Sequence, residues 1–330
     1  MSGLSAMKRR EFIASLGAAL AFPKVVHGQQ PAVAIGVLSS SSSDDYRPMI
    51  AAFRQGLSEA GYVEGRNVSF DYAWADGHYD RLPALAAELA RHEVNVILAA
   101  STPSALAAKA ATSTIPIVFA IGGAPVRTGL VSSLNRPGGN LTGAAHINVD
   151  TAKKRLELLH ELVPHRTSLG LMTNPSNPLA NSVEAEVRAA AEALGLQLSI
   201  LHASTDEAID AVFKDAASGA VGGLVIGTDP LFTSRIDMLG RPSLQLKVPA
   251  IYQYRDFVAA GGAMSHGGDI KGSYYHAGVY AGRILKGERP ANLPVQLSTK
   301  VELFLNLKTA TALGIDPPAA LLARADEMIE

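Results

Sequence analysis

From residue 33 onward, short apolar runs alternate with segments whose apolar residues recur three and four positions apart. An apolar run fits a strand buried on both faces, and the longer spacing fits one face of a helix. Strand, helix, strand in this order predicts a parallel sheet with right-handed crossovers. The predicted elements of this first series are strands at 33–38, 68–72, 94–99 and 117–121, with helices over 48–60, over 82–89 and from 103 onward.

The alternation restarts after a turn-forming stretch rich in glycine, proline and asparagine at residues 135–140. We therefore expect two sheets of one kind rather than a single large sheet. The predicted fold class is α/β, with two Rossmann-like lobes whose parallel sheets are joined by a hinge. The elements of this second series are strands at 141–145, 168–172, 196–201, 223–226 and 249–252, with helices over 151–162, 180–194 and 205–217.

The chain is expected to cross between the lobes near residues 138–146 and again near 261–268, after which a helix over 274–285 returns to lobe 1. The predicted boundaries are 29–145 with 267–300 for lobe 1, and 146–266 for lobe 2. Residues 301–330 form a helical C-terminal tail that the sequence assigns to neither lobe. An extended segment is predicted over 295–304 and leads into this tail, which continues with two short helices over 307–313 and 318–328.

The first 28 residues have the pattern of a cleavable export signal. A basic cluster at 8–10 precedes an apolar run at 12–22, and the small residue Gly28 suits a cleavage site. The apolar run is shorter than the roughly 20 residues that span a bilayer, which favours a signal peptide over a retained anchor. Arg9 and Arg10 resemble the twin-arginine signature, with an ordinary secretory signal as the alternative. We expect a periplasmic protein that is soluble after signal cleavage.

Composition excludes several classes of function. The formal net charge is −1, so the chain offers no basic field for nucleic acid. The absence of cysteine excludes a thiolate zinc site, an iron–sulfur cluster, a cysteine nucleophile and a lipid-anchored N-terminus. The G-x-S-x-G, H-E-x-x-H, Walker and early G-x-G-x-x-G patterns are also missing. We expect no catalytic residues, no metal and no cofactor, and the alternative is a serine–histidine–aspartate site assembled from distant residues.

Four polar loops follow predicted strands, at the sheet edge where ligands of parallel α/β proteins bind. Thr102 suits the N-cap of a helix and Pro103 its first position, so the helix N-terminus there favours a carboxylate or phosphate. Asp229 suits a ligand ammonium. For each loop the alternative is a capping or turn role without a ligand. The candidate ligand-binding residues in these loops are Ser39, Ser40, Ser41, Ser101, Thr102, Pro103, Asn174, Asn177 and Asp229.

Aromatic residues are scarce, yet Tyr252 and Tyr254 cluster beside Arg255. Tyrosine rings make amphipathic walls, so both tyrosines are added to the candidate ligand-binding residues. Trp74, near His78 and Tyr79, is interpreted as a surface aromatic rather than as a second wall.

Nine stretches carry a resemblance to a known family, at 9–13, 53–57, 61–67, 114–118, 136–143, 260–265, 293–296, 306–310 and 321–327. With these residues, the whole chain resembles the ABC-transporter substrate-binding protein family that is related to tryptophan- and tyrosine-import components. The resemblance implies the type I periplasmic-binding fold and a cleft faced by residues 39–41, 101–103, 174–177 and Asp229. This chain has Ala124-Pro125-Val126 where relatives often carry Asp-Pro-Val, and His266 where they often carry Tyr. If the missing acid binds an ammonium group, an amino acid is a weaker candidate ligand.

The predicted function is capture of a small molecule, such as an aromatic amino acid or related carboxylate, by lobe closure. The predicted partners are that ligand and an ABC permease in the membrane, and the protein is expected to be a monomer. The alternatives are an exported hydrolase or oxidoreductase, and a ligand-sensing subunit of a membrane receptor.

Overall fold

The computed structural model describes residues 33–330. The predicted signal peptide, its arginine pair and its cleavage site lie outside the described residues. Within residues 33–330, no helix combines the length and the apolar character that crossing a membrane requires.

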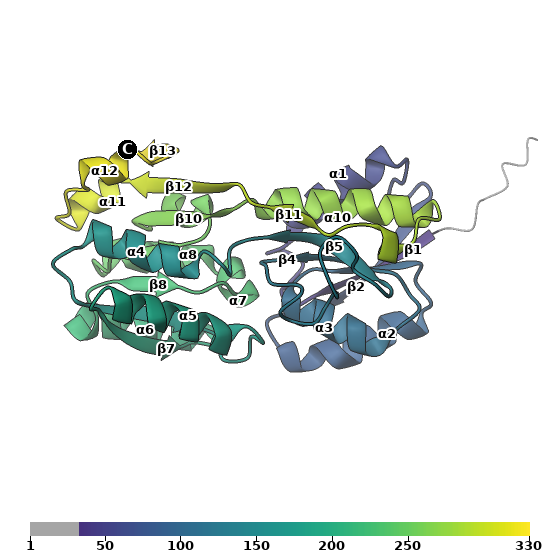
Figure 1. Cartoon of the computed structure of the whole chain (residues 1–330), viewed down its shortest axis with the longest axis horizontal. Helices are drawn as coiled ribbons and strands as arrows, with labels where there is room; N and C mark the ends of the chain where they lie inside the picture. The colour runs from purple at the N-terminus through teal and green to yellow at the C-terminus, as the bar shows by residue number, and fades with distance from the viewer. Residues whose placement is uncertain (1–32) are drawn as a thin grey trace, which may run out of the picture. The chain divides into compact units, whose positions relative to one another are not determined.

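The first sheet gathers strands from the N-terminal half and one strand from near the C-terminus. Its strands are β1 (Val33–Ser39), β2 (Val68–Trp74), β3 (Val96–Ala99), β4 (Ile117–Ile121), β5 (Leu141–His146) and β11 (Gln296–Ser298). Their order across the sheet is β11-β5-β4-β3-β1-β2, and each neighbouring pair is parallel. The apolar runs become buried strands here because both faces of the sheet are covered by helices (Figure 1).

The second sheet has the order β13-β12-β10-β9-β8-β6-β7. Its pairs are parallel except β10 with β12, which is antiparallel. Two mostly parallel sheets confirm the predicted α/β class. The strands are β6 (Ser168–Thr173), β7 (Gln197–His202), β8 (Leu224–Ile226), β9 (Ala250–Tyr252), β10 (Met264–Gly268), β12 (Val301–Asn306) and β13 (Glu327–Ile329).

Each sheet and its helices is called a lobe below. In lobe 1, α1 and α10 lie side by side on one face of the sheet, and α2 and α3 lie on the other (Figure 1). The lobe 1 helices are α1 (Arg47–Glu59), α2 (Leu82–Arg91), α3 (Thr102–Ala111) and α10 (Ile270–Leu285). The lobe 2 helices are α4 (Ala152–Leu162), α5 (Ala180–Ala193), α6 (Asp206–Asp215), α7 (Pro230–Ser234), α8 (Ile236–Gln245), α9 (Arg255–Ala259), α11 (Leu307–Ala312) and α12 (Ala319–Leu322).

The chain passes between the two sheets at three places in the described range. The expected crossings at 138–146 and 261–268 contain strands β5 and β10, so the chain crosses just after those segments rather than within them. The third crossing, between β11 and β12, divides the single extended segment that the sequence predicts over 295–304 (Figure 1). Both β12 and β13 belong to the second sheet, and the helix expected over 318–328 is wrong beyond Leu322. The predicted domain boundaries stay a prediction.

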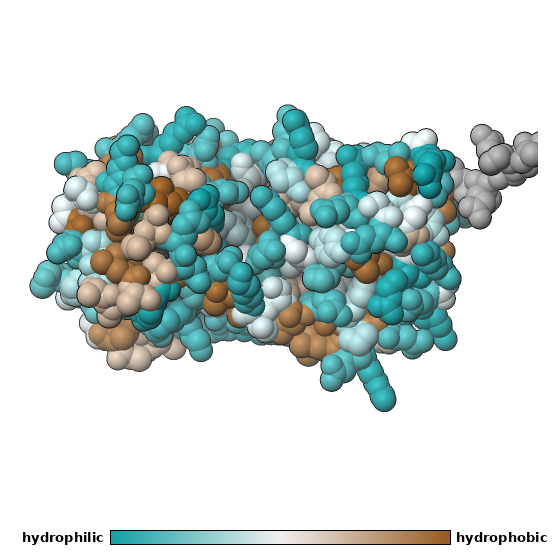
Figure 2. Space-filling view, turned by 90° about the horizontal axis from the view of Figure 1, so that it is seen from above, coloured by the Kyte–Doolittle hydropathy of each residue, from teal (hydrophilic) through white to brown (hydrophobic). Residues whose placement is uncertain are grey.

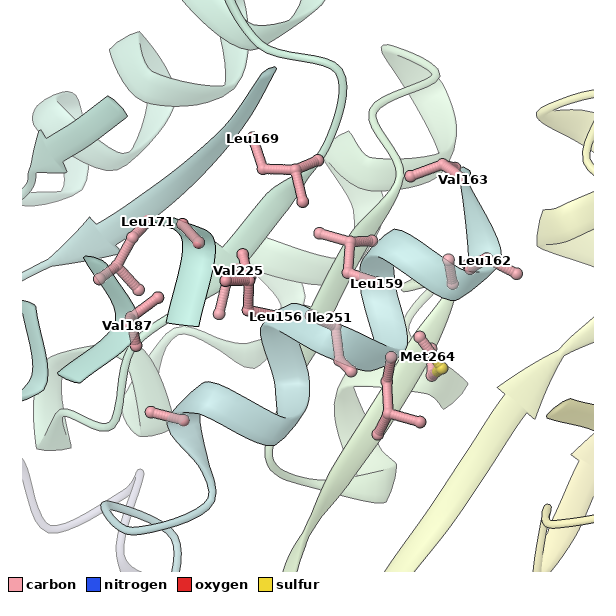
Figure 3. Packing of buried hydrophobic residues seen from close by; sticks show 14 of the residues in the cluster. Leu156, Leu159, Leu162, Val163, Leu169, Leu171, Val187, Val225, Ile251 and Met264 are labelled. Carbon is pink, nitrogen blue, oxygen red and sulfur yellow. The ribbon is translucent and has the colours of Figure 1, made fainter. Parts of the chain in front are cut away.

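The lobe 2 core shows how helical spacing becomes packing. Leu156 and Leu159, one turn apart on α4, are fully buried against Val225 of β8 and Ile251 of β9 (Figure 3). Burying one such side chain contributes about 1.5–3 kcal/mol, and with no cysteine in the sequence this packing replaces disulfide cross-links.

Two glycines allow α1 and α10 to approach closely. A Cβ atom on Gly56 would lie 2.0 Å from the Tyr275 carbonyl oxygen, and one on Gly278 would lie 2.0 Å from the Phe53 carbonyl oxygen. Both glycines are unfavourable inside isolated helices, so the helix–helix contact outweighs local propensity here.

We predict that Gly278→Ala lowers the free energy of unfolding by about 1–3 kcal/mol, because the added methyl group meets backbone atoms rather than a flexible side chain. Helix propensity alone predicts a gain of about 1 kcal/mol for the same change. Chemical denaturation measures the difference, with His276→Ala on the exposed face of α10 as the control. A stability gain for Gly278→Ala contradicts the close packing.

Candidate functional site

Both lobes line a small cavity at the carboxyl ends of their strands. Its volume is about 40 Å³, and we call it the inner cavity. The structure brings six of the eleven predicted residues to its wall, three from each lobe. They are Ser101, Thr102 and Pro103 of lobe 1, and Asn177, Asp229 and Tyr254 of lobe 2.

The other five predicted residues lie behind this wall. Ser39, Ser40 and Ser41 are buried, and the Ser40 hydroxyl donates to Ser101 Oγ at 3.0 Å. Asn174 donates to Asp229 at 3.1 Å, and the Tyr252 hydroxyl lies 3.0 Å from Thr233 Oγ1. These residues support the wall rather than line it.

The N-cap of α3 is Ser101, one residue before the predicted Thr102. Ser101 has extended backbone, and its hydroxyl accepts from the Ser104 N–H at 3.2 Å. Thr102 and Pro103 then occupy the first two helical positions, where proline is tolerated because its missing N–H has no helical partner. The shift places Thr102 at the cavity wall, at the positive end of the helix dipole.

Asp229 is a fully buried carboxylate at the start of α7. Its Oδ1 accepts from the Tyr79 hydroxyl at 2.8 Å, from the Leu231 N–H at 2.9 Å and from Asn174. Its Oδ2 accepts one hydrogen bond from the described residues, from Asn177 Nδ2 at 2.7 Å. Burial raises the pKa of Asp229, and the hydrogen bonds from Asn177, Asn174 and Tyr79 partly offset that rise. Oδ2 therefore keeps capacity for a further donor from the cavity.

Tyr79 is a site residue that the sequence analysis missed. It follows β2 in lobe 1, and its hydroxyl reaches across to Asp229 in lobe 2. Burial raises the pKa of Tyr79 well above its usual range, and the Asp229 charge adds to that rise, so the hydroxyl stays a donor. The sequence feature that could have identified Tyr79 as a site residue is its position shortly after the carboxyl end of a strand.

His146, at the end of β5, was also missed. Its Nε2 lies 3.2 Å from the Tyr254 hydroxyl of lobe 2, and its Nδ1 lies 3.2 Å from the Ser273 hydroxyl of α10. Burial lowers the pKa of His146 from its ordinary 6.5 to about 4, so the ring is neutral at neutral pH. A single histidine with no neighbouring motif gave no sequence signal.

A buried arginine lies behind the lobe 2 wall. Arg155 is fully buried, and its guanidinium donates to Thr228 Oγ1 at 3.1 Å and to the Asn148 carbonyl at 3.0 Å. No carboxylate pairs with it among the described residues. Burial lowers the pKa of Arg155 to about 10, which leaves it charged at neutral pH. Thr228 lines the inner cavity, so a positive charge lies one side chain behind that wall.

A larger hollow of about 710 Å³, here called the outer groove, adjoins the inner cavity. Thr233, Gln253, Tyr254 and Ile270 line both spaces, so these four residues lie between the small cavity and the wide groove. The outer groove is lined from α1 and α10 of lobe 1 and from α7, α8, α9, β10 and β12 of lobe 2. The side of the molecule that carries α1, α10 and β12 is mainly hydrophilic, with its apolar residues in separate groups (Figure 2).

The two departures from the family pattern lie away from these spaces. Ala124 has a φ of 57° and packs against the lobe 2 core, and it lines neither hollow. His266 also lines neither of them. Asp229 is the acidic residue that lines the inner cavity, and the effect of Ala124 on the ligand stays a prediction.

Residues 33–329 match the family described as ABC transporter substrate binding protein. A curated relative is the tyrosine-binding protein of Clostridioides difficile strain R20291, which is 28% identical over 269 residues, 81% of this chain and 77% of the relative.

Two solved structures each cover 90% of this chain, with 99% of their own length matched. An ABC domain in complex with L-Trp from Streptococcus pneumonia is 26% identical, with a TM-score of 0.80. A ligand-free, open substrate binding protein with adhesive properties from Clostridium difficile is 25% identical, with a TM-score of 0.60. These similarities confirm the predicted type I periplasmic-binding fold, and the chain superposes better on the L-Trp complex than on the open form.

We predict that acid destabilises the protein through His146. The unfolded histidine binds a proton near pH 6.5 and the folded one only near pH 4, so stability falls as pH drops between those values. His146→Gln removes this proton uptake, so the variant should lose about 1–2 kcal/mol less than the wild type between pH 7 and pH 5. Chemical denaturation at both pH values measures this, and equal losses contradict the assignment.

Proposed function

The chain belongs to the ABC transporter substrate-binding protein family, and from that premise we propose that it captures a small zwitterionic solute outside the cytoplasm for an ABC importer. The observation that carries the proposal is the inner cavity, with a buried carboxylate on its lobe 2 wall and a helix N-terminus on its lobe 1 wall. The membrane partner would be a permease, and the protein would act as a soluble monomer after loss of its signal.

The wall chemistry fits an amino acid head group. The ligand ammonium would donate to Asp229 Oδ2, which accepts one hydrogen bond from the described residues. The ligand carboxylate would meet the N-terminus of α3 at Thr102, where the helix dipole favours negative charge. Because the two charges bind to different lobes, one ligand would hold the lobes together.

Size and walls favour an aromatic amino acid. A cavity of about 40 Å³ accommodates only the head of such a ligand, so its side chain would extend past Tyr254 toward the outer groove. The tyrosine ring offers a stacking face at that point. The relatives that bind tyrosine and L-Trp support the same ligand class.

Lobe closure is the proposed mechanism. Polar contacts join the lobes around the cavity: Tyr79 with Asp229 and with the Leu231 N–H, Ser41 with the Pro230 carbonyl, Tyr254 with His146, and Arg235 with Asp45 at 3.3 Å. Arg127 of lobe 1 also pairs with Glu186 of lobe 2. Typical hydrogen bonds contribute about 0.5–1.5 kcal/mol each, so opening and closing would be nearly balanced and ligand binding would shift the balance. The better superposition on the L-Trp complex than on the open relative supports two such arrangements.

A hydrolase is not favoured, although Ser273 and His146 are in contact. Ser273 is buried and does not line the inner cavity, and its hydroxyl lies 3.2 Å from the histidine. The second ring nitrogen of His146 faces Tyr254 rather than a carboxylate. The low pKa of the ring, which burial causes, also makes it a poor general base at neutral pH.

We predict that L-tyrosine or L-tryptophan stabilises the wild type by about 2.7 kcal/mol at one hundred times its dissociation constant. Asp229→Asn should weaken binding by tenfold or more, because it removes the ammonium's charged partner. Analogues that lack the amine should bind the wild type weakly and the variant no worse. Thermal shift and calorimetry measure this, with Asp210→Asn on the exposed face of α6 as the control. Full affinity in Asp229→Asn contradicts the proposed ammonium site.

A second prediction tests closure itself. A Cβ atom on Gly122 of lobe 1 would lie 3.0 Å from Thr228 Cγ2 of lobe 2. Gly122→Val should therefore hold the lobes apart, reduce affinity and keep the radius of gyration large when ligand is added. Gly122→Ala should have a much smaller effect. Small-angle scattering with and without ligand measures the radius of gyration of each variant. A normal ligand-induced decrease in the radius of gyration of Gly122→Val counts against closure.

A further inference from the structure

An aromatic stack runs along β2, the edge strand of the first sheet. Phe70, Tyr72 and Trp74 alternate along the strand and therefore share one face. Ring centroids are 5.7 Å apart for Phe70 and Tyr72 and 5.6 Å apart for Tyr72 and Trp74, with interplanar angles of 13° and 9°. All three rings are partly exposed, in a chain that is only 6% aromatic.

The last two rings border a surface groove of about 150 Å³. Two arginines of α1 form its other side, Ile50 is its apolar member, and Ser43 completes it. We call it the Trp74 groove. None of its residues lines the inner cavity or the outer groove, so it is separate from the cleft. Its lining is Ser43, Arg47, Ile50, Arg54, Tyr72 and Trp74.

The two arginines are held by weak partners. Arg47 pairs with Asp44, and both side chains are largely exposed, at 78% and 83%. Arg54 pairs with Glu64, donates to the Tyr72 hydroxyl at 2.6 Å and lies 5.5 Å from the Phe70 ring centroid. Exposed ion pairs contribute about 0–1 kcal/mol, so an anion in the groove competes with them easily.

We propose that the Trp74 groove is a second binding site, for a small planar aromatic carboxylate. The Tyr72 and Trp74 rings supply a stacking surface, and guanidinium groups bind carboxylates through paired, charge-assisted hydrogen bonds. The volume of about 150 Å³ limits the occupant to a single small ring system with its carboxylate. The site requires no amine on its ligand, which distinguishes it from the cleft.

Trp74 is the only tryptophan in the sequence, so its fluorescence reports on this groove alone. Benzoate is the probe, with excitation at the red edge of the indole band, where neither tyrosine nor benzoate absorbs. We expect saturable quenching of Trp74 by benzoate, binding about tenfold weaker with benzamide, which lacks the charge, and no quenching by cyclohexanecarboxylate, which lacks the planar ring. Equal quenching by benzoate and benzamide overturns the proposal.

Charge variants test the arginines. Arg54→Gln should raise the benzoate dissociation constant about tenfold, and Arg54→Lys should fall between it and the wild type. Arg66→Gln, an exposed change in the same lobe, is the matched control and should have no effect. Arg47→Gln repeats the test on the second arginine if Arg54→Gln does not fold. Unchanged affinity in both glutamine variants overturns the site.

The same titration with L-tyrosine at a saturating concentration separates the groove from the cleft. The groove shares no lining residue with the inner cavity or the outer groove, so quenching by benzoate should persist when the cleft is occupied. Loss of the quenching there assigns the signal to the cleft and overturns the second site, while leaving the proposed capture function intact. Persistent quenching together with failure of aromatic amino acids to stabilise the wild type supports the groove and contradicts the capture function.

Discussion

The guanidinium of Arg155 holds together the region where the chain passes between the lobes. It donates to the carbonyl of Asn148 in the first crossing and to that of His266 on β10, just before the second. Asn148 Oδ1 in turn accepts from the Gly268 N–H at 2.6 Å, so the two crossings are joined directly. A buried charge is expensive unless it is hydrogen-bonded, and carbonyl oxygens supply that compensation here. The two segments approach so closely that a Cβ on Gly267 would lie 2.7 Å from Asn148 Oδ1.

Most of the fold follows from periodicity, because strands buried on both faces must be apolar throughout. The strand at 117–121 matches the structure residue for residue. The helix α1 differs from the prediction by one residue at each end, and α4 differs by one residue at its start. The C-terminal tail was harder to predict, because the chain continues directly from β11 in the first sheet to β12 in the second. A local pattern cannot indicate a change of partner within one extended segment. The strand β13 was missed for a related reason, since its three residues gain their strand character only by pairing with β12.

The cavity wall was partly predictable for a different reason. Loops at the carboxyl ends of parallel strands meet at one edge of the sheet, so position alone was enough to predict Ser101, Asn177 and Asp229 as site residues. Contacts between lobes have no such rule. Tyr79 and Asp229 are 150 positions apart and their bond depends on how the sheets face each other, which the sequence does not express locally. The same limit applies to Ala124. Its importance was inferred from a family pattern, and the position of its side chain against the lobe 2 core could not be read from the sequence.

The proposed binding groups and the apolar cores occupy different parts of the molecule. The buried clusters are apolar and lie within the lobes, whereas the interface around the inner cavity is joined by hydrogen bonds that water replaces at little cost. In the proposed mechanism, opening the cleft would therefore leave each core intact. Asp229 and Thr228 both line the lobe 2 wall, and the Arg155 guanidinium donates to the Thr228 hydroxyl from behind. In the proposed mechanism the wall therefore carries a negative charge at Asp229, with a positive charge just behind Thr228. A solute with a single charge satisfies only part of this arrangement. A zwitterion satisfies the carboxylate of lobe 2 and the helix N-terminus of lobe 1 together, and only when the lobes are closed.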